Sequence, residues 1–318
     1  MSWNDWREKH KQFKAALDAD QVEREAIRIG PTSIEFGTED ERTAGVIDDA
    51  LAGQGNAWDE RQEVLENVTG AVAEEIERRV QIMGNAYPFA LLDGALEYTP
   101  SGTGVYEYCL EVAARPSAEI PRFPKASAVF EYIARDVITI HIGGGKGFRT
   151  GAPIYPAEAR GNSTRESFLE LNAQCGEFVW EPRPDFPSEP SHQDLKDAGL
   201  DVVVWKPWPD GRNAHLFFIG QCACGKNDIN INKARETSLG RLSNWLRPIA
   251  HVTPMRSFLT AHHIPNTIQL YEISGEGGLV FDRARIVMIA ESDLNFMTRD
   301  GAHDYMALAK LLEMQPVA

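Results

Sequence analysis

The residues whose types and spacing offer chemistry lie in one short stretch in the second half of the chain: Asp201, Gln221, Cys222 and Lys226. Asp201 directly precedes the apolar run 202–205, and Gln221 ends a second apolar run that begins at Leu216. A Pro-Asp-Gly turn between the two runs predicts a hairpin of two strands. An acid, an amide and a lysine would then gather at one end of neighbouring strands.

This set of side chains suits the metal-assisted hydrolysis of a phosphodiester. Mg²⁺ or Mn²⁺ takes hard oxygen ligands, which Asp201, the side-chain oxygen of Gln221 and the backbone carbonyl of Cys222 could supply. A nearby ammonium group can orient the nucleophile or offset the charge that develops in the transition state. Lys226 is the lysine that follows the second strand, and Lys206 is the one that ends the first.

The elements that must position the hairpin belong to an α/β fold. Apolar residues at helical spacing predict a helix over 126–141, in which Glu131 is a carboxylate near the middle, and a second helix over 163–175. We expect a first strand at 178–180, then the hairpin, a helix over 233–246 and a strand over 256–261. Further β structure is expected over 277–289. The predicted core is therefore helix, three strands, helix, strand.

A helix glutamate, an aspartate at a hairpin and an acid or amide with a lysine on the next strand resemble the PD-(D/E)xK nuclease superfamily. The strings 199–206, 218–227 and 281–286 resemble, more closely, a group of uncharacterised bacterial restriction-endonuclease-like proteins associated with phage defence. The resemblance covers about residues 85–290. It implies a metal-dependent nuclease core, with Asp201 and Gln221 as metal ligands, Lys226 as the catalytic lysine and Glu131 as the helix carboxylate.

The chain departs from that superfamily pattern at two positions. The pattern places a lysine two residues after the acid on the same strand face, where this chain has Ala223. Lys226 follows Gln221 by an odd number of residues, which reverses the face on a regular strand, so Lys226 fits only if the strand bends or ends by Gly225. Gln221 also lacks the charge of a carboxylate ligand.

Charge divides the chain into two parts. Residues 1–120 hold 11 Lys and Arg against 24 Asp and Glu, a net of −13, while residues 121–318 hold 21 against 23, a net of −2. Proline-rich residues 115–124 mark the predicted boundary between an acidic, mainly helical N-terminal domain (1–120) and a nuclease domain (121–318). The charge of the second domain therefore does not exclude a polyanion, and the nuclease hypothesis makes DNA the expected partner, with RNA as the alternative; the first domain could dock a basic protein partner.

No run of residues reaches the 18 to 20 apolar residues of a typical membrane helix, and the start is unlike a signal peptide, so we expect a cytoplasmic protein without membrane spans. The main alternative to an enzyme is a non-catalytic nucleic-acid-binding or regulatory protein on a degenerate nuclease fold. A hydrolase built on His262 and His263 is disfavoured, because adjacent residues of a strand point to opposite faces. Residues 143–147 lack the P-loop spacing and favour a glycine turn, and Cys222 and Cys224 lack the usual zinc spacing.

Overall fold

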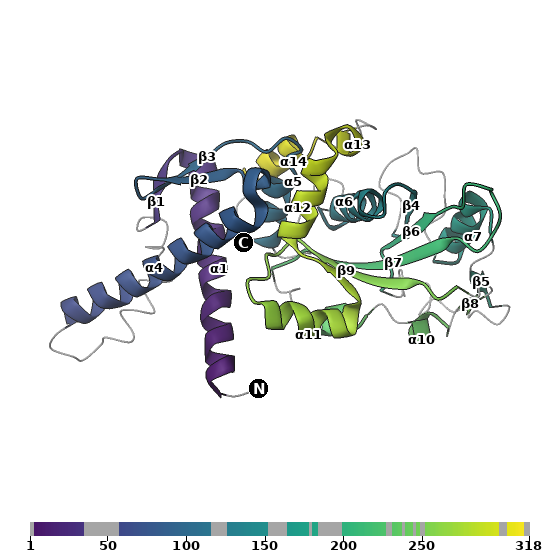
Figure 1. Cartoon of the computed structure of the whole chain (residues 1–318), viewed down its shortest axis with the longest axis horizontal. Coiled ribbons are helices and arrows are strands. Elements are labelled where there is room, and N and C mark those ends of the chain that lie inside the picture. The colour runs from purple at the N-terminus through teal and green to yellow at the C-terminus, as the bar shows by residue number, and fades with distance from the viewer. Residues whose placement is uncertain are drawn as a thin grey trace. The chain divides into compact units, whose positions relative to one another are not determined.

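Figure 1 shows the computed structural model of the chain, coloured from the N-terminus to the C-terminus. The structure describes residues 3–34, 57–115, 126–151, 164–177, 180–183, 199–226, 231–236, 239–243, 246–248, 252–298 and 304–314. Two compact units make up the chain: unit 1 is 1–102 with 263–269, and unit 2 is 103–262 with 270–318. None of the helices in the described part combines the length and the apolarity that crossing a bilayer requires.

Unit 1 consists of two long helices and a small sheet. Helix α1 (Trp3–Ile29) is followed by Gly30, whose positive φ of 94° suits glycine. Helix α4 (Ala57–Met83) continues into the 3₁₀ turn η1 (Gly84–Ala86). Strands β1 (Thr32–Ser33), β3 (Ala95–Tyr98) and β2 (Phe89–Leu92) form an antiparallel sheet in that order. The two long helices agree with the mainly helical character expected of the N-terminal part of the chain.

A buried ionic cluster joins the two helices of unit 1. The Arg79 side chain is fully buried and donates to Glu23 on α1 at 2.7 Å and to Glu75 on α4 at 2.9 Å. Arg79 also donates to the carbonyl oxygen of Ala16 at 2.9 Å, and the Tyr87 hydroxyl donates to Glu23 at 2.5 Å. Because an unpaired buried charge is costly, these mutual partners fix the pairing of α1 with α4.

Unit 2 is built on a mixed five-stranded sheet with the strand order β10-β9-β7-β6-β4. Its strands are β4 (Lys146–Arg149), β6 (Val202–Lys206), β7 (Leu216–Ala223), β9 (Met255–Thr260) and β10 (Leu279–Phe281). Strands β4, β6 and β7 are antiparallel neighbours, whereas β9 runs parallel to β7 and β10 runs parallel to β9. The predicted hairpin is β6–β7, with Val202 opposite Gly220 and Lys206 opposite Leu216.

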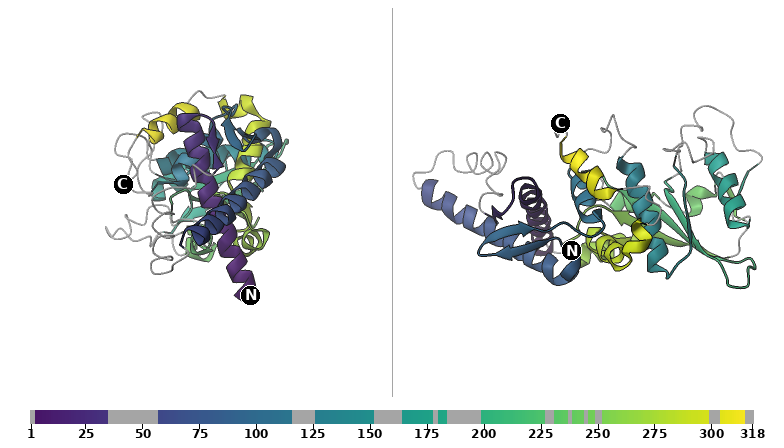
Figure 2. Two further views of the ribbon diagram at one scale, coloured as in Figure 1. Left: turned by 90° about the vertical axis from the view of Figure 1, so that its left-hand side faces the viewer. Right: turned by 90° about the horizontal axis from the view of Figure 1, so that it is seen from above.

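Helices cover both faces of this sheet, as Figures 1 and 2 show. Helix α6 (Ala126–His141) packs against β4, β6 and β7, and behind it lie α5 (Val105–Ala113), α12 (Arg283–Ser292), α13 (Leu294–Thr298) and α14 (Tyr305–Glu313). On the other face α7 (Thr164–Cys175) and α10 (Leu239–Leu242) join a core of buried apolar residues: Phe148, Phe168, Leu171, Val203, Trp205, Phe217, Ile219 and Leu242.

The α/β class is confirmed, but several elements differ from the prediction. The first strand of the large sheet is β4, next to the glycine turn, whereas Trp180–Pro182 is β5 of a separate two-stranded sheet with β8 (Leu246–Pro248). The expected helix over 233–246 is two short helices, α9 (Ile231–Ala234) and α10.

Two further differences lie in the last 60 residues of the chain. Helix α11 (Thr267–Gly277) had not been expected, and only Leu279–Phe281 of the β structure expected over 277–289 is a strand. Asp282 ends that strand because its side chain accepts from the Arg285 backbone N–H and caps α12. The apolar residues over 283–290 therefore belong to a helix, α12, and not to the strand that was expected there.

The division between the units lies earlier in the chain than residue 120. Helix α5 belongs to unit 2, where it contacts α6, α12 and α14. Every residue of α5 is buried, as expected for a helix enclosed by its own unit. The proline-rich segment expected to separate the domains lies mostly at 116–125, outside the described residues.

Candidate functional site

Asp201 stands immediately before β6 and acts as part of the sheet. Its backbone N–H donates to Gly220 on β7 at 2.9 Å, and its carbonyl oxygen accepts from Thr150, just after β4, also at 2.9 Å. Its carboxylate Oδ2 accepts from the backbone N–H of Cys222, with 2.6 Å between oxygen and nitrogen. The carboxylate therefore supplies an acceptor to β7 where β6 has not yet begun.

Gln221 is a residue of β7, next to Asp201 on the neighbouring chain segment, and its side chain points away from α6. A side chain at Gly220 would meet Val202 and Ile138, a residue of α6, so Gly220 faces that helix and Gln221 faces the opposite side. The amide Nε2 of Gln221 is 3.3 Å from Glu236 Oε2 and 3.5 Å from the carbonyl oxygen of Cys222. The side chain is thus held between two oxygen atoms.

Glu236, which sequence reasoning missed, is the second carboxylate of this site. It follows the short helix α9, and its Oε1 is 3.3 Å from the ammonium nitrogen of Lys233. Its backbone carbonyl would lie 3.0 Å from a side chain at Gly199, which has a positive φ of 77°. Glycine at 199 therefore lets the segment that leads into Asp201 pass close to Glu236. In the sequence, Lys233 and Glu236 form only an ordinary i, i+3 surface pair.

Lys226 lies beyond the end of β7. That strand ends at Ala223, and the backbone N–H of Lys226 donates to the carbonyl oxygen of Arg115 at 2.9 Å. The carbonyl oxygen of Gly225 is 2.9 Å from His262 Nε2, so this loop is held at two points. The Lys226 side chain is exposed. Among the described residues the structure records no ion pair for its ammonium group.

Glu131 is on α6, on the face of the sheet opposite Gln221. Its Oε2 accepts from Arg149 Nη1 at 2.7 Å, in a pair whose side chains are 12% and 3% exposed. The Arg149 guanidinium also lies 5.2 Å from the centre of the Tyr132 ring. The structure therefore brings Asp201, Gln221 and Cys222 together, adds Glu236 and Lys233, and places Glu131 in a pair with Arg149.

The two adjacent histidines serve different partners. His262 contacts Gly225 as described, and His263 Nε2 is 3.2 Å from Glu75 Oε1 in unit 1. All four cysteines have free thiols. Within the described ranges, no group of three or more histidine, cysteine, aspartate and glutamate side chains is arranged to hold a metal ion. Any cation at Asp201 would therefore need ligands besides these four residue types, such as an amide, a backbone carbonyl, water or substrate.

Burial controls the thiol chemistry of unit 2. Desolvation raises the pKa of the Cys109 thiol to about 12, against the opposing effect of the Arg283 charge. Desolvation also raises the pKa of Cys175. Because the thiolate is the reactive form, these two residues are inert structural thiols.

Comparison of the chain with family models, with curated proteins and with solved structures finds no match.

Proposed function

We propose that this protein is a metal-dependent nuclease of the PD-(D/E)xK type that hydrolyses DNA, with RNA as the alternative substrate. The observation that carries the proposal is the pairing of Asp201 with the Gln221-Cys222 segment at the ends of two neighbouring antiparallel strands. These residues are far apart in the sequence, and a carboxylate beside amide and carbonyl oxygens is the kind of donor set that hard cations take.

The order of elements around the large sheet supports the proposal. Helix α6 is followed by β4, and the antiparallel strands β6 and β7 come after α7 and β5; the short helices α9 and α10 and the strand β8 then precede β9, which is parallel to β7. With α7, β5 and β8 treated as insertions, this order is compatible with the helix, three strands, helix, strand core that the resemblance implies. Asp201 lies at the start of the second of those strands and Gln221 lies near the end of the third.

The donor atoms at this position fit Mg²⁺ or Mn²⁺. Asp201, which bonds the Cys222 N–H, and Glu236, which lies 3.3 Å from the Gln221 amide, offer carboxylates, and the Cys222 carbonyl and the Gln221 amide offer neutral oxygens. Glu236 also restores the negative charge that glutamine lacks relative to the superfamily pattern. A divalent cation bound there would polarise the scissile phosphate and lower the pKa of an attacking water.

The residues of the chain have separate tasks in this proposal. Asp201 is 7% exposed and is held by the Cys222 N–H, so its carboxylate is positioned before any ligand arrives. Glu236 holds the Lys233 ammonium by an ion pair at 3.3 Å, close to Gln221. An ammonium group in that place can offset the charge on a phosphate during the reaction. In the superfamily pattern this role belongs to a lysine at the position where this chain has Ala223. We therefore assign that role to Lys233 in preference to Lys226.

The test of the nuclease is direct. Purified protein is incubated with supercoiled plasmid, linear DNA and RNA, each with Mg²⁺, Mn²⁺ or EDTA. Cleavage of DNA that needs the metal and is lost in Asp201→Ala supports the proposal. Lys310→Ala, an exposed lysine on α14, is the matched control and should cleave at the wild-type rate. Cleavage by Asp201→Ala at the wild-type rate would remove Asp201 from the site.

A role in antiphage defence in the cytoplasm follows from the resemblance alone. We expect expression of the wild-type chain in bacteria to lower the plating efficiency of at least one phage in a diverse panel. Asp201→Ala, produced at the same level, should lose that protection. Equal plating with both proteins on every phage would argue against defence while leaving the cleavage assay to decide the chemistry.

A non-catalytic nucleic-acid-binding protein on the same fold is the second candidate. It is favoured by the hydrogen bond that already engages Asp201 Oδ2, and by the absence of a three-residue histidine, cysteine, aspartate or glutamate cluster among the residues described. This alternative predicts DNA binding in EDTA, no cleavage with any divalent metal and unchanged binding in Asp201→Asn.

A further inference from the structure

The loop that joins β6 to β7 is exposed along its whole length. Strand β6 ends at Lys206 and β7 begins at Leu216, and every residue from 206 to 214 is exposed. Lys206 is five positions along β6 from Asp201, or about 16 Å on a strand that rises about 3.3 Å per residue. The loop is therefore a surface of unit 2 that is separate from the candidate nuclease site.

Both ends of this loop are fixed to the rest of unit 2. Lys206 Nζ donates to the carbonyl oxygen of Ile142, just after α6, at 2.6 Å. At the other end the backbone N–H groups of Ala214 and His215 donate to Glu177 Oε2 at 3.0 and 3.4 Å, and Glu177 is buried. Ala214 has a positive φ of 74°, which is uncommon for a residue other than glycine. The buried carboxylate therefore holds the loop in one shape without any ligand.

Trp208 is the aromatic residue of the loop. It is 56% exposed, and its indole N–H donates to the carbonyl oxygen of Ala214 at 2.8 Å. Prolines at positions 207 and 209 flank it and restrict the backbone on both sides. The indole N–H is the only polar group of a tryptophan side chain, so what remains for a partner is the apolar surface of an oriented ring. Such a ring recognises a partner by stacking.

Positive charge surrounds this ring. Residues 206–214 contain Lys206 and Arg212 against one carboxylate, that of Asp210, in a chain whose net charge is −15. The Arg212 side chain is 85% exposed, and it forms an ion pair with Asp210 at 2.6 Å. Lys146 on β4 is also exposed, and it lies opposite Trp205, close to the start of the loop. The cations of this end of the sheet therefore suit a polyanion.

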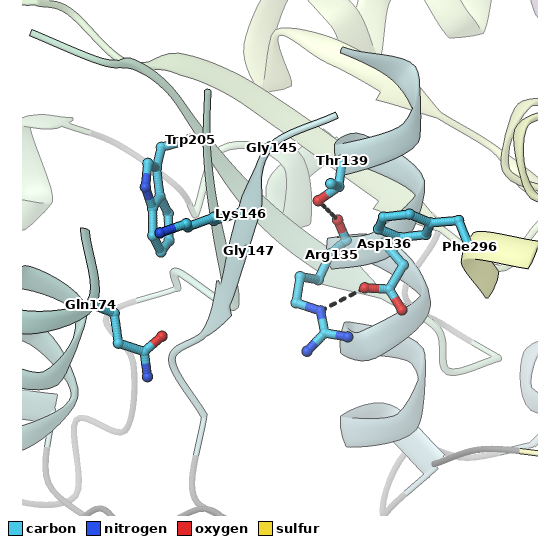
Figure 3. Close-up of a pocket in the computed structure, with 9 residues that line it drawn as sticks. All are labelled: Arg135, Asp136, Thr139, Gly145, Lys146, Gly147, Gln174, Trp205 and Phe296. Carbon is cyan, nitrogen blue, oxygen red and sulfur yellow. Dashed lines mark hydrogen bonds and ion pairs between the residues drawn. The ribbon is translucent and has the colours of Figure 1, made fainter. Parts of the chain in front are cut away.

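The two sides of β4 carry different charged groups. In Figure 3 the side chain of Lys146 lies beside Trp205 on one side of the strand, whereas Arg135 and Asp136 lie on the other side. Arg135 Nε donates to Asp136 Oδ1 at 2.6 Å, so this guanidinium already has a carboxylate partner. We therefore include Lys146, and not Arg135, in the basic surface around the loop.

We propose that the β6–β7 loop, residues 206–214, holds a single-stranded segment of nucleic acid, with one base stacked on Trp208 and phosphates at Arg212 and Lys146. An unpaired base has a free face for the indole, whereas a base inside a duplex is already stacked on its neighbours. The choice of nucleic acid as the partner rests on the proposed nuclease function. A distance of about 16 Å corresponds to about five nucleotides at about 3.4 Å each, so the loop would hold the strand away from the scissile phosphate.

Binding is measured on the full-length Asp201→Ala protein in EDTA, so that neither cleavage nor metal affects the result. Fluorescence anisotropy compares a labelled single-stranded oligonucleotide with a duplex of the same sequence. Trp208→Ala should weaken binding of the single strand at least about fivefold and binding of the duplex less, because a stacked base is lost. Trp208→Phe keeps a ring and should retain most of the affinity. Tyr271→Ala, which removes an exposed aromatic ring of α11, is the matched control and should bind as the parent does.

An oligonucleotide with abasic positions separates stacking from any loss of loop structure. The parent protein should bind it more weakly than the complete single strand, whereas Trp208→Ala should bind both alike. A variant that is merely unfolded would lose both ligands to the same extent as the control ligand, the duplex. Melting temperatures of parent and variant confirm that the loop substitution leaves the fold intact.

The phosphate contacts have tests of their own. Arg212→Ala should weaken binding and reduce the slope of log affinity against log salt by about one, since one cation is removed. Asp210→Asn keeps an acceptor for the Arg212 backbone N–H, which is 3.0 Å from Asp210 Oδ1, and removes a negative charge. It should therefore tighten binding at low salt. Lys310→Ala, on α14, is the control and should keep the salt slope of the parent.

Single-strand affinity that Trp208→Ala leaves unchanged would overturn the proposal, and so would an equal loss for single strand and duplex. Absence of binding to either oligonucleotide would also overturn it and would make a protein the partner to seek, because tryptophan and arginine are common in protein interfaces. Cleavage at Asp201 is measured separately with the unsubstituted protein. Cleavage without any effect of Trp208→Ala on binding would reject the loop contact alone, and Trp208-dependent binding without cleavage would reject the nuclease alone.

Discussion

The carboxylate of Asp201 and the backbone N–H of Cys222 form a hydrogen bond of 2.6 Å between residues 21 positions apart. This bond makes Asp201 a structural acceptor for β7, and in the proposed site the same carboxylate is a metal ligand. The two roles can be separated by substitution, because asparagine keeps an acceptor and loses the charge.

Asp201→Asn should therefore keep most of the stability and lose the nuclease activity by at least about a hundredfold, because a ligand charge is lost. Asp201→Ala should lose the activity as well and also about 1–3 kcal/mol of stability, since the Cys222 N–H loses its partner. Urea unfolding and plasmid cleavage measure the two effects. Equal stability of the two variants would show that the hydrogen bond contributes little to folding.

Gln221→Glu should tighten Mn²⁺ binding and lower stability without metal. The new carboxylate would stand about where the Gln221 amide now lies, 3.3 Å from Glu236, so two like charges would repel each other until a cation arrives. Thermal unfolding in EDTA and with Mn²⁺ measures both effects. The double variant Gln221→Glu/Glu236→Gln is the control, and it should restore the stability in EDTA. An unchanged response to Mn²⁺ would place Gln221 outside the metal site.

Lys233→Ala should slow cleavage more than Lys226→Ala does, by about a hundredfold if the ammonium stabilises the transition state. The reason is position: Lys233 is paired with Glu236 beside Gln221, whereas Lys226 lies on an exposed loop. Single-turnover rates at saturating DNA measure the effect, and Lys233→Arg, which keeps the charge, should recover part of the rate. A larger loss in Lys226→Ala would return the catalytic role to that lysine.

The acidity of the N-terminal part of the chain should oppose the approach of DNA. Truncation at residue 121 would remove α5 from unit 2, so neutralising exposed charges on α4 is the better test. Glu66→Gln/Glu74→Gln/Glu77→Gln should bind DNA more tightly than the wild type at low salt. The difference should shrink as salt rises, because the Debye length falls to about 8 Å at physiological ionic strength.

Equal DNA affinity of the wild type and the triple variant at every salt concentration would leave these charges with no role in substrate access. The strongly acidic N-terminal part of the chain could also bind a basic protein partner. Copurification of such a partner with the wild type, and its loss from the triple variant at low salt, would support that interaction.

Asp18→Asn should stabilise the protein at neutral pH and have no such effect in acid. Desolvation by burial raises the pKa of Asp18 above its usual value, with Lys14 partly opposing the shift. A carboxyl group whose pKa is raised by folding binds its proton more tightly in the folded state, so stability falls as pH rises through the window between the two pKa values. Melting temperatures of wild type and variant from pH 3 to pH 8 should therefore diverge as pH increases. Parallel curves would contradict the assignment.

The sequence by itself determined the elements that depend on local pattern. Apolar spacing marked α6 and α7, and the Pro-Asp-Gly turn between β-rich runs marked the β6–β7 hairpin. These features are set by residues close together in the chain, so a single sequence is enough to find them. The hairpin in turn placed Asp201 opposite the end of β7, which is why these two parts of the site could be predicted.

Only the tertiary structure decided which other side chains lie next to Asp201 and Gln221. Strand alternation puts Gln221 on the face away from α6, so Glu131 pairs with Arg149 and Glu236 becomes the carboxylate beside Gln221. β4 is likewise a strand because it pairs with β6, more than 50 residues later, although its glycines favour a turn. Such pairings depend on register and on face, which are properties of the assembled sheet and are not set by any short stretch of sequence.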